Sequence, residues 1–474
     1  MDINKSHIFK SVFSMSGFSL LAGGLSILQI SITARFVSPK EFGIFAFASM
    51  ILALFTSFLK AIPLGLIKTE KPSHSQIYNV QKFCHFAAIS FFLSSLLIGA
   101  LVQKYLNKEG FFIILSTMAL SLFFLSFEQV RSSLIRKELE MAKIALAKSI
   151  ALIVSFFVTV YLAFKGYGVW ALVSCLLINS FVETILIRMQ SNVLIERDHQ
   201  ARDSYKIIKF GFLRGIDQSI QALIQKVDQY FIGIFLGNSS LGLYSVSSNL
   251  AKRPFDLINP VLGGIIFPVY SKVQYNDRQL EYYWSNNMKI FAIAFLILGA
   301  FLSVFSELLT NILLGENWLN ADIIFGIIFF GLAFDIMGMP IRQIAQVYGF
   351  NSRLITYNVI SVFAILIPLA ILFLYSESLI LTAYIIVVSK IFLYLFSYFY
   401  LLRGSRVRPY KVLKQILLRT LFPLSLFICS SLFYPAFLIK LISFLLFVVV
   451  CVYLNLDVIH KNITLLLNYK NEKA

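Results

Sequence analysis

Apolar residues in this chain occur in blocks of about twenty, and these blocks recur along nearly the whole sequence. About twenty residues of α-helix cross the roughly 30 Å hydrocarbon core of a bilayer. Transmembrane β-strands would be shorter and would alternate apolar with polar residues, a pattern that the sequence lacks. A soluble domain has roughly 25% charged residues, whereas this chain has 14% charged and 58% hydrophobic residues. The sequence therefore predicts an all-α integral membrane protein.

The apolar blocks predict about fourteen transmembrane helices. We place them at residues 8–34, 42–66, 82–103, 110–130, 146–164, 168–188, 212–236, 241–266, 288–313, 320–341, 354–375, 378–402, 416–434 and 436–456. The first block is too long for the apolar part of a signal peptide. About 32 Lys and Arg residues fall on one side of these spans and about 6 on the other, and loops rich in positive charge stay in the cytoplasm. Both termini are therefore expected to be cytoplasmic.

The same charge distribution excludes several classes of function. The net charge of +18 comes from loops between spans, so it does not indicate a nucleic-acid partner. The sequence has no GxxxxGK[ST] loop, and ATP is not expected to drive its activity. Its five histidines and four cysteines form no metal-binding motif. We expect no enzyme activity, no catalytic residue, no metal and no cofactor.

An internal repeat relates two regions by a gapless offset of 199 residues. The segment Phe36–Phe45 aligns with Phe235–Tyr244, and each contains a tight turn followed by Gly, an aliphatic residue and an aromatic residue. Both segments follow an outward-going span, which predicts two parallel pseudo-repeated bundles around a central cavity. We expect residues 1–205 to form the first bundle and residues 206–402 the second. Residues 403–474 would form the last two helices and a cytoplasmic tail.

The seventh predicted span has an unusually polar stripe. At 100° per residue, one face of a helix carries Arg214, Gln218, Gln221, Gln225 and Gln229. Asp217 and Asp228 border this stripe, and Lys226 lies between them in sequence. Charged groups at the centre of a bilayer cost roughly 3 kcal/mol on insertion scales, so this face should not meet lipid. It lines either a water-filled cavity or a hydrogen-bonded seam between helices.

Other polar groups within the spans give weaker signals. Asp335, Arg342 and Gln346 share a face, and Arg342 either binds an anionic ligand or extends to the lipid headgroups. Glu128 and Arg131 are three residues apart and are expected to pair. Three single charges within their spans are interpreted as structural: Lys60, Glu183 and Lys390.

Three stretches of the chain are similar to one family of transporters. They are Ala34–Gly43; Leu134–Met141 followed by Gly166–Val173; and Asp228–Gly233 continuing through Leu236-Gly237, Leu241–Tyr244 and Arg253-Pro254. In order and spacing the sequence resembles the polysaccharide-transporter (Wzx-type) flippases of the multidrug/oligosaccharidyl-lipid/polysaccharide exporter superfamily. The similarity covers most of the chain and weakens after about residue 400.

This resemblance implies a flippase in the bacterial cytoplasmic (inner) membrane. Its substrate would be an oligosaccharide repeat unit on undecaprenyl pyrophosphate, used for O-antigen, capsule or exopolysaccharide assembly. The polar groups agree, because cations suit the phosphates and amides suit the sugar hydroxyls. The expected cavity residues are Arg214, Gln218, Gln221, Gln225, Lys226 and Arg342, and the candidate coupling residues are Asp217, Asp228 and Asp335. A polysaccharide polymerase and a chain-length regulator are candidate protein partners.

Three other functions stay open from the sequence alone. A cation-coupled multidrug antiporter of the same superfamily would use one of these carboxylates for coupling. A membrane polymerase or glycosyltransferase of the polysaccharide pathway would need a longer external loop than the predicted ones. A non-transporting scaffold for an assembly complex is the third.

Overall fold

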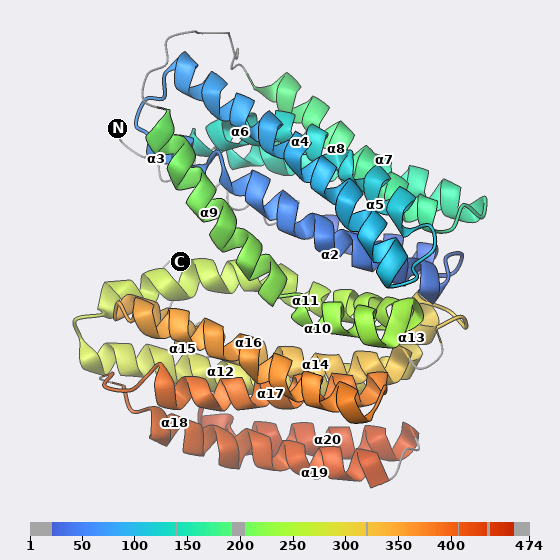
Figure 1. The fold of residues 1–474 in the computed structure, drawn as a ribbon. Coiled ribbons are helices and arrows are strands. Elements are labelled where there is room, and N and C mark those ends of the chain that lie inside the picture. Colours follow the sequence, from blue (N-terminus) through green and yellow to red (C-terminus); the bar gives the residue numbers. More distant parts are fainter. Residues whose placement is uncertain are drawn as a thin grey trace, which may run out of the picture. The chain divides into compact units, whose positions relative to one another are not determined.

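The computed structural model describes residues 21–138, 140–191, 204–318, 321–405, 407–433 and 437–458, apart from the side chains of residues 256–265, 351 and 429–433. Helices make up almost all of these ranges, and no strand occurs within them (Figure 1). The prediction of an all-α protein is confirmed. The first part of the first predicted span, residues 8–20, lies outside the described residues.

The chain divides into two compact units. Unit 1 consists of Met1–Val246 with Leu313–Trp318, and unit 2 consists of Ser247–Ile312 with Leu319–Ala474. The division falls inside one helix, α11, rather than in a loop. The boundaries expected for the repeated bundles, after residues 205 and 402, stay predictions.

Unit 1 begins, within the described residues, with a helix over Leu21–Ala34. It continues with α2 (Pro39–Ala61), α3 (Leu64–Lys68), α4 (His74–Tyr105), α5 (Phe111–Ala119), α6 (Ser121–Lys137), α7 (Met141–Phe164), α8 (Val169–Gln190), α9 (Tyr205–Ile224), α10 (Val227–Phe231) and the π-helix η1 (Ile232–Leu236). The N-terminus of α2 is fixed by a capping box, in which the Glu41 backbone N–H donates to Ser38 and the Ser38 N–H donates to Glu41. The turns that follow the helix Leu21–Ala34 and α7 are short, at residues 35–38 and 165–168.

Unit 2 receives the chain through α11 (Gly237–Val273). Its other helices are α12 (Asp277–Val304), α13 (Ser306–Leu313, whose last residue belongs to unit 1), α14 (Ala321–Met337), α15 (Met339–Val347), α16 (Asn351–Tyr375), α17 (Leu379–Tyr400), α18 (Pro409–Ile416), the π-helix η2 (Leu417–Leu421), α19 (Phe422–Phe433) and α20 (Phe437–Leu454). Although Pro254 lacks a backbone N–H, it does not end α11.

Ten helical segments of the described chain are long and apolar enough to cross a membrane. Nine of them lie within a predicted span or extend it by several residues. The tenth, Asp277–Val304, is displaced from the predicted span 288–313, whose end is formed by α13. The remaining predicted spans correspond to the short apolar helix Leu21–Ala34, to the polar segment α9–η1, to α11, and to α18–α19, which η2 interrupts. The chain is therefore a multi-pass membrane protein.

Small residues bring α9 close to α2. Gly211, Gly215 and Ser219 are spaced four apart, so they share one face of α9. A β-carbon at Gly211 would collide with the backbone carbonyl of Ile62, and the Ser219 hydroxyl donates to the Leu54 carbonyl over 2.9 Å. Spacing of this kind lets transmembrane helices pack backbone to backbone. This contact fixes the rotation of α9 about its axis within unit 1.

The two repeated turns contact each other within unit 1. A β-carbon at Gly43 would collide with the Asn238 carbonyl, and a β-carbon at Gly242 would collide with the Pro39 carbonyl. The offset of 199 residues converts Gly43 into Gly242 and Pro39 into Asn238, so the two contacts are reciprocal. Reciprocal contacts of this kind are expected between segments related by a two-fold axis. They support the interpretation of the turns as a parallel repeat.

A buried lysine holds the second of these turns. Lys108, in the loop between α4 and α5, is 6% exposed. Its ammonium group donates to the Gly233 carbonyl on η1 over 3.1 Å and to the Asn238 side chain, and it lies 4.8 Å from the centre of the Phe47 ring. Burial lowers the pKa of Lys108 to about 8. The contact ties the α4–α5 loop to the start of α11.

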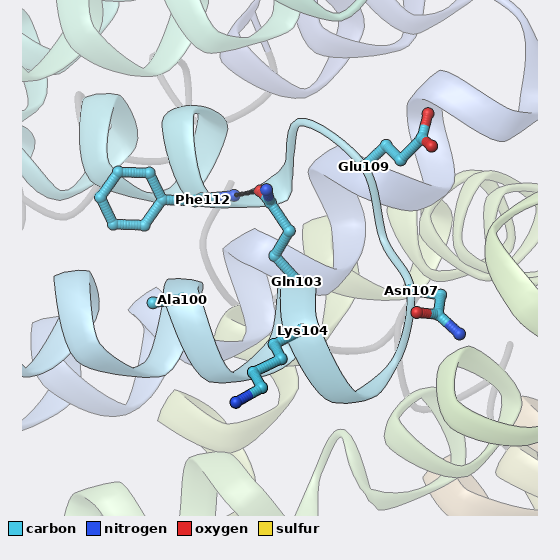
Figure 2. A pocket seen from close by; sticks show the side chains of 6 residues that line it. All are labelled: Ala100, Gln103, Lys104, Asn107, Glu109 and Phe112. Atoms are coloured by element: carbon cyan, nitrogen blue, oxygen red, sulfur yellow. Dashed lines mark hydrogen bonds between the residues drawn. The ribbon is translucent and has the colours of Figure 1, made fainter.

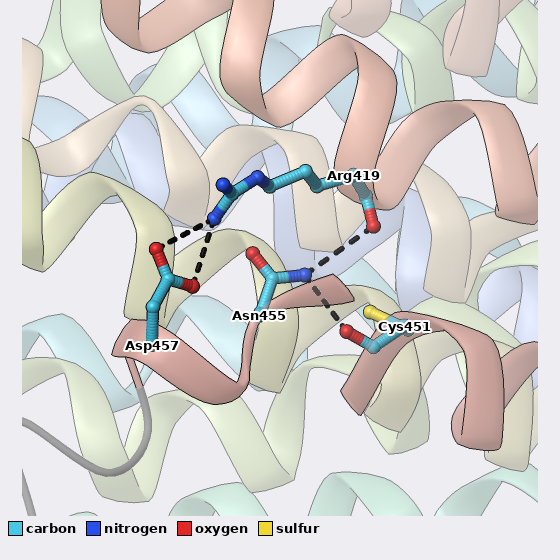
Figure 3. Close-up of polar contacts among 4 residues, drawn as sticks. All are labelled: Arg419, Cys451, Asn455 and Asp457. Carbon is cyan, nitrogen blue, oxygen red and sulfur yellow. Dashed lines mark hydrogen bonds and ion pairs between the residues drawn. The ribbon is translucent and has the colours of Figure 1, made fainter. Parts of the chain in front are cut away.

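Polar contacts also join the last helices of unit 2. Arg419 on η2 pairs with both carboxylate oxygens of Asp457 at 2.8 Å, and the Asn455 side chain donates to the carbonyls of Arg419 and Cys451 (Figure 3). The hydrogen bond from Arg419 lowers the pKa of Asp457. Both partners are partly or largely exposed, so the ion pair positions the end of the chain more than it stabilises the unit.

Candidate functional site

Helix α9 has three distinct faces. The small residues described above pack against α2, while a second, exposed face is apolar and includes Phe212, Ile216 and Leu223. The predicted polar stripe lies opposite the apolar face, and Arg214, at its start, has a side chain that is 53% exposed. Gln221 and Gln225 are exposed as well, and Gln218 is half-buried. In a membrane an exposed apolar face suits lipid, whereas an exposed polar face requires water or a polar ligand.

The stripe is held mainly by bonds within its own helix. Arg214 pairs with Asp217 at 3.1 Å, and the Gln221 amide donates to the same carboxylate over 3.3 Å. Gln218 and Gln225 have no side-chain hydrogen bond to another described residue. These contacts leave donors and acceptors of the amides available to a ligand or to water.

The seventh predicted span is not one continuous helix. It is interrupted at Gln225 and Lys226, resumes as α10, widens into η1 and turns at Gly237, which has a φ of +80°. Lys226 donates to the Gln229 side chain over 3.2 Å. Broken helices and π-bulges in membrane proteins occur where backbone groups line a site or a cavity. The continuous helix expected over residues 212–236 is thus wrong, because polar residues and a glycine replace the apolar repeat there.

The Asp228 carboxylate is held by hydrogen bonds within the fold and is not free to bind a ligand. The buried Tyr244 hydroxyl donates to it over 2.6 Å, and the Gln229 backbone N–H donates to its other oxygen over 2.9 Å. Tyr244 lies near the start of α11, so this bond joins α10 to α11 within unit 1. A coupling role for Asp228 would require this bond to break.

The expected residues of unit 2 come together at a second helix interruption. α14 ends and α15 begins around Gly338, and Arg342 lies across this point, 3.5 Å from the Asp335 carboxylate. Arg342 also donates to the Asp335 carbonyl over 3.0 Å and acts electrostatically on Tyr357. Lys252 and Lys390 act electrostatically on Asp335. Lys390, interpreted from the sequence as a lone charge, therefore belongs to this group.

A third group of charges was missed by the sequence interpretation. Glu128 on α6 is only 4% exposed and accepts a hydrogen bond from Gln129. The charged groups that act on it are Glu183, Lys148, Lys60 and Arg136, from four helices of unit 1. Arg131, its expected partner, donates instead to the Phe127 carbonyl over 3.1 Å. The expected Glu128–Arg131 pair is wrong, because residue spacing along α6 carries no information about the partners that α2, α7 and α8 supply.

Unit 1 also has a shallow surface pocket at the α4–α5 loop (Figure 2). It has a volume of about 620 Å³ and is lined by Ala100, Gln103, Lys104, Asn107, Glu109 and Phe112. The Gln103 side chain accepts a hydrogen bond from the Phe112 backbone N–H, so this amide stabilises the start of α5. Figure 2 shows the Glu109 and Asn107 side chains apart from each other and from Lys104, without the convergence expected of a binding site.

Among known proteins, the chain matches the family described as "Polysaccharide biosynthesis protein" over residues 32–323. It is 23% identical over 298 residues to the lipopolysaccharide biosynthesis protein WzxC of Escherichia coli K12, covering 62% of this chain and 61% of WzxC. It is 28% identical over 113 residues to the teichuronic acid biosynthesis protein TuaB of Bacillus subtilis 168, covering 24% of this chain and 23% of TuaB. The matched region thus spans about three-fifths of the length of WzxC and about a quarter of the length of TuaB.

Among solved structures, the fold is similar to that of the lipid II flippase MurJ in an inward closed conformation. The TM-score is 0.74 at 15% identity, covering 94% of this chain and 99% of MurJ. An inward-facing multidrug resistance transporter of the MATE family has a TM-score of 0.61 at 13% identity, covering 83% of this chain and 96% of that transporter. These likenesses establish the fold, and the family match covers more than half of the chain. The chain belongs to the polysaccharide biosynthesis protein family.

Proposed function

We propose that this protein is a flippase that moves a lipid-linked oligosaccharide across the bacterial cytoplasmic membrane. The lipid is undecaprenyl pyrophosphate, and the product serves O-antigen, capsule or exopolysaccharide assembly. The observation that carries the proposal is the exposed polar face of α9, which contains a cation and three amides and leads into an interrupted helix. A pyrophosphate and several sugars need such groups to cross hydrocarbon, because each unpaired polar group costs several kcal/mol there.

The proposed binding residues are those expected from the sequence. In unit 1, Arg214 and Lys226 supply positive charge to the phosphates, and Gln218, Gln221 and Gln225 bind sugar hydroxyls. Arg342 supplies positive charge in unit 2. Asp217 and Asp335 keep these arginines oriented and are the proposed coupling groups together with Asp228.

This proposal makes the protein a transporter without catalytic chemistry, ATP or cofactor. Its termini would be cytoplasmic, and a polymerase and a chain-length regulator would receive its product. Reporter fusions after Gln190, Asn276 and Val407 should then report the cytoplasm, and fusions after Lys165, Gly237 and Glu377 the outside.

A multidrug antiporter is the weaker alternative. It would bind a cationic drug through a carboxylate, yet Asp217 and Asp335 each face an arginine, at 3.1 Å and 3.5 Å. An arginine at this distance competes with a cationic ligand for the carboxylate.

The test is delivery of lipid-linked sugar to the outer leaflet in a strain that lacks the protein. Expression of the full chain should restore delivery, measured as glycan accessible to an external lectin or enzyme. An antiporter would restore drug efflux but not delivery. If the protein were a polymerase, single repeat units would already reach the outside in the strain that lacks it, and that result would overturn the proposal.

A further inference from the structure

Unit 2 encloses a pocket that the proposed function does not use. It has a volume of about 400 Å³, within the range of roughly 300–1,000 Å³ typical of small-molecule sites. Its walls come from α12, α14, α17, α19 and α20. Most of the lining is apolar, and its large side chains include Phe330, Phe334, Ile391 and Phe427. Val388 lines the pocket and is exposed, so the pocket opens sideways.

Polar groups gather at one end of this pocket. Asp322 is near the start of α14, Lys440 is near the start of α20, and Ser303 and Ser306 are at the junction of α12 and α13. A β-carbon at Gly326 would lie 3.3 Å from the Ser303 hydroxyl and 3.4 Å from the Ser306 hydroxyl, so both hydroxyls approach the glycine that lines the pocket. The pocket therefore has a polar mouth at the helix ends and an apolar interior.

The two charges at the mouth have opposite signs, and Asp322 lies in the first turn of α14, where the helix dipole favours its carboxylate. Asp322 and Lys440 are half-buried, and within the described residues neither side chain takes part in a hydrogen bond or an ion pair. Charged side chains at the end of a membrane helix either extend to the headgroups or bind a ligand, and the position of these two at the mouth of a pocket favours a ligand. Together they suit a ligand with a negative and a positive group.

The depth of the pocket indicates the rest of the ligand. Along α14 the lining residues run from Asp322 through Gly326 and Phe330 to Phe334 at intervals of four, which places them on one face. Twelve residues of helix span about 18 Å, slightly more than half of the roughly 30 Å hydrocarbon core. This is the depth that an acyl chain of one leaflet occupies. A polyprenyl chain is much longer and carries only negative charge at its head.

We propose that this pocket binds a zwitterionic aminophospholipid of the membrane. Its phosphate accepts hydrogen bonds from Lys440, its ammonium group donates to Asp322, and one acyl chain lies along Phe330 and Phe334. Pockets between transmembrane helices recognise lipids through headgroup charge in this manner. The site does not depend on the proposed flippase function, since it would bind a bulk membrane lipid rather than the transported molecule.

The test measures lipid binding to the purified full-length protein in detergent. Phosphatidylethanolamine and phosphatidylglycerol with identical acyl chains are titrated, and bound lipids are counted by native mass spectrometry. We expect the wild type to prefer phosphatidylethanolamine by about tenfold. Asp322→Asn should remove this preference, and Lys440→Gln should weaken the binding of both lipids by about tenfold. The matched controls Glu307→Gln and Lys411→Gln change charges that do not line the pocket and should behave as wild type.

A charge exchange guards against variants that fold poorly. The double variant Asp322→Lys with Lys440→Asp keeps one charge of each sign at the mouth and should retain the preference for phosphatidylethanolamine. Equal binding of the two lipids by the wild type would overturn the proposal. A second result would also overturn the proposal. If polyprenyl phosphate displaced phosphatidylethanolamine and bound more tightly to Asp322→Asn than to the wild type, the pocket would be a polyprenyl site.

Discussion

The polar face of α9 and the charged group around Glu128 lie in the same unit and consist of similar residue types, but they are built differently. Arg214 on α9 is 53% exposed and pairs within its own helix, whereas Glu128 is 4% exposed and is surrounded by charges from other helices. An exposed, locally paired group can exchange its partner for a ligand, while a buried group loses stability if its surroundings change. The comparison therefore assigns binding to α9 and helix packing to the Glu128 group.

The largest expected effect is on transport by a variant of α9. Arg214→Ala removes a cation that the account assigns to the pyrophosphate, and hydrogen bonds to charged groups contribute roughly 1.5–3 kcal/mol. Delivery of glycan to the outer leaflet should fall by about tenfold or more at equal protein level. Arg214→Lys should retain more delivery, since it keeps the charge but loses the two-pronged geometry of arginine.

The matched control is Arg188→Ala, which removes an exposed arginine at the end of α8. It should leave delivery unchanged. Lys390 is unsuitable as a control because it belongs to the charged group around Asp335. Equal loss in the Arg188 and Arg214 variants would mean that general positive charge, and not the α9 stripe, supports delivery.

The second effect is on stability and concerns the Glu128 group. Glu128→Ala removes the acceptor of the Gln129 amide from a buried position, which should lower the free energy of unfolding by about 1–3 kcal/mol. Delivery should fall only as far as the amount of folded protein falls. Thermal unfolding in detergent, followed by size-exclusion chromatography, measures the change.

The control for Glu128→Ala is a variant of another residue in the charged group around Glu128. Glu183→Gln removes the 3.8 Å pair with Lys148, whose side chain is 54% exposed, and the charge that acts on Glu128 and Lys60. The like charge near Glu128 is removed at the same time, so the loss should be at most about 1 kcal/mol. If Glu128→Ala abolished delivery without changing stability, the Glu128 group would be part of the transport site and the contrast with α9 would be lost.

These two regions also show what could be predicted from the sequence. The stripe was predicted because its residues recur at helical spacing on one segment. Arg214, Gln221 and Gln225 are exposed, whereas Gln229, beyond the break in the helix, is 2% exposed. The Glu128 group could not be predicted, since Lys60, Lys148 and Glu183 are single charges on separate helices. The break at Gln225 and Lys226 had a local signal in its run of polar residues, but hydropathy averages such a run into one span. Periodicity describes one helix at a time, and tertiary contacts decide the rest.

The smallest expected effect concerns Lys108, a buried cation outside the spans. Its folded-state pKa of about 8 lies below the ordinary 10.5, so the unfolded chain binds more protons between these values. Stability should therefore rise as pH increases from about 8 toward 10.5, relative to Lys108→Met, which keeps an unbranched apolar side chain but cannot titrate. Unfolding temperatures of both proteins at pH 7.5 and 9.5, values that roughly bracket the lower pKa, test this. If the unfolding temperature changed by the same amount between the two pH values in both proteins, this would contradict the burial of a titrating Lys108.

The central claim is that the polar face of α9 meets water while its opposite face meets lipid. Single cysteines at Gln218, Gln221, Gln225 and Leu223, in a chain whose four native cysteines are replaced, test it with a membrane-impermeant thiol reagent applied to inverted and right-side-out vesicles. We expect labelling at the three glutamine positions and protection at Leu223, because lipid covers the Leu223 side chain, which no other part of the protein buries. Protection at all three glutamine positions would contradict the claim and make the stripe a seam between helices. Equal labelling at all four positions would contradict it as well, because the Leu223 face would then meet water rather than lipid.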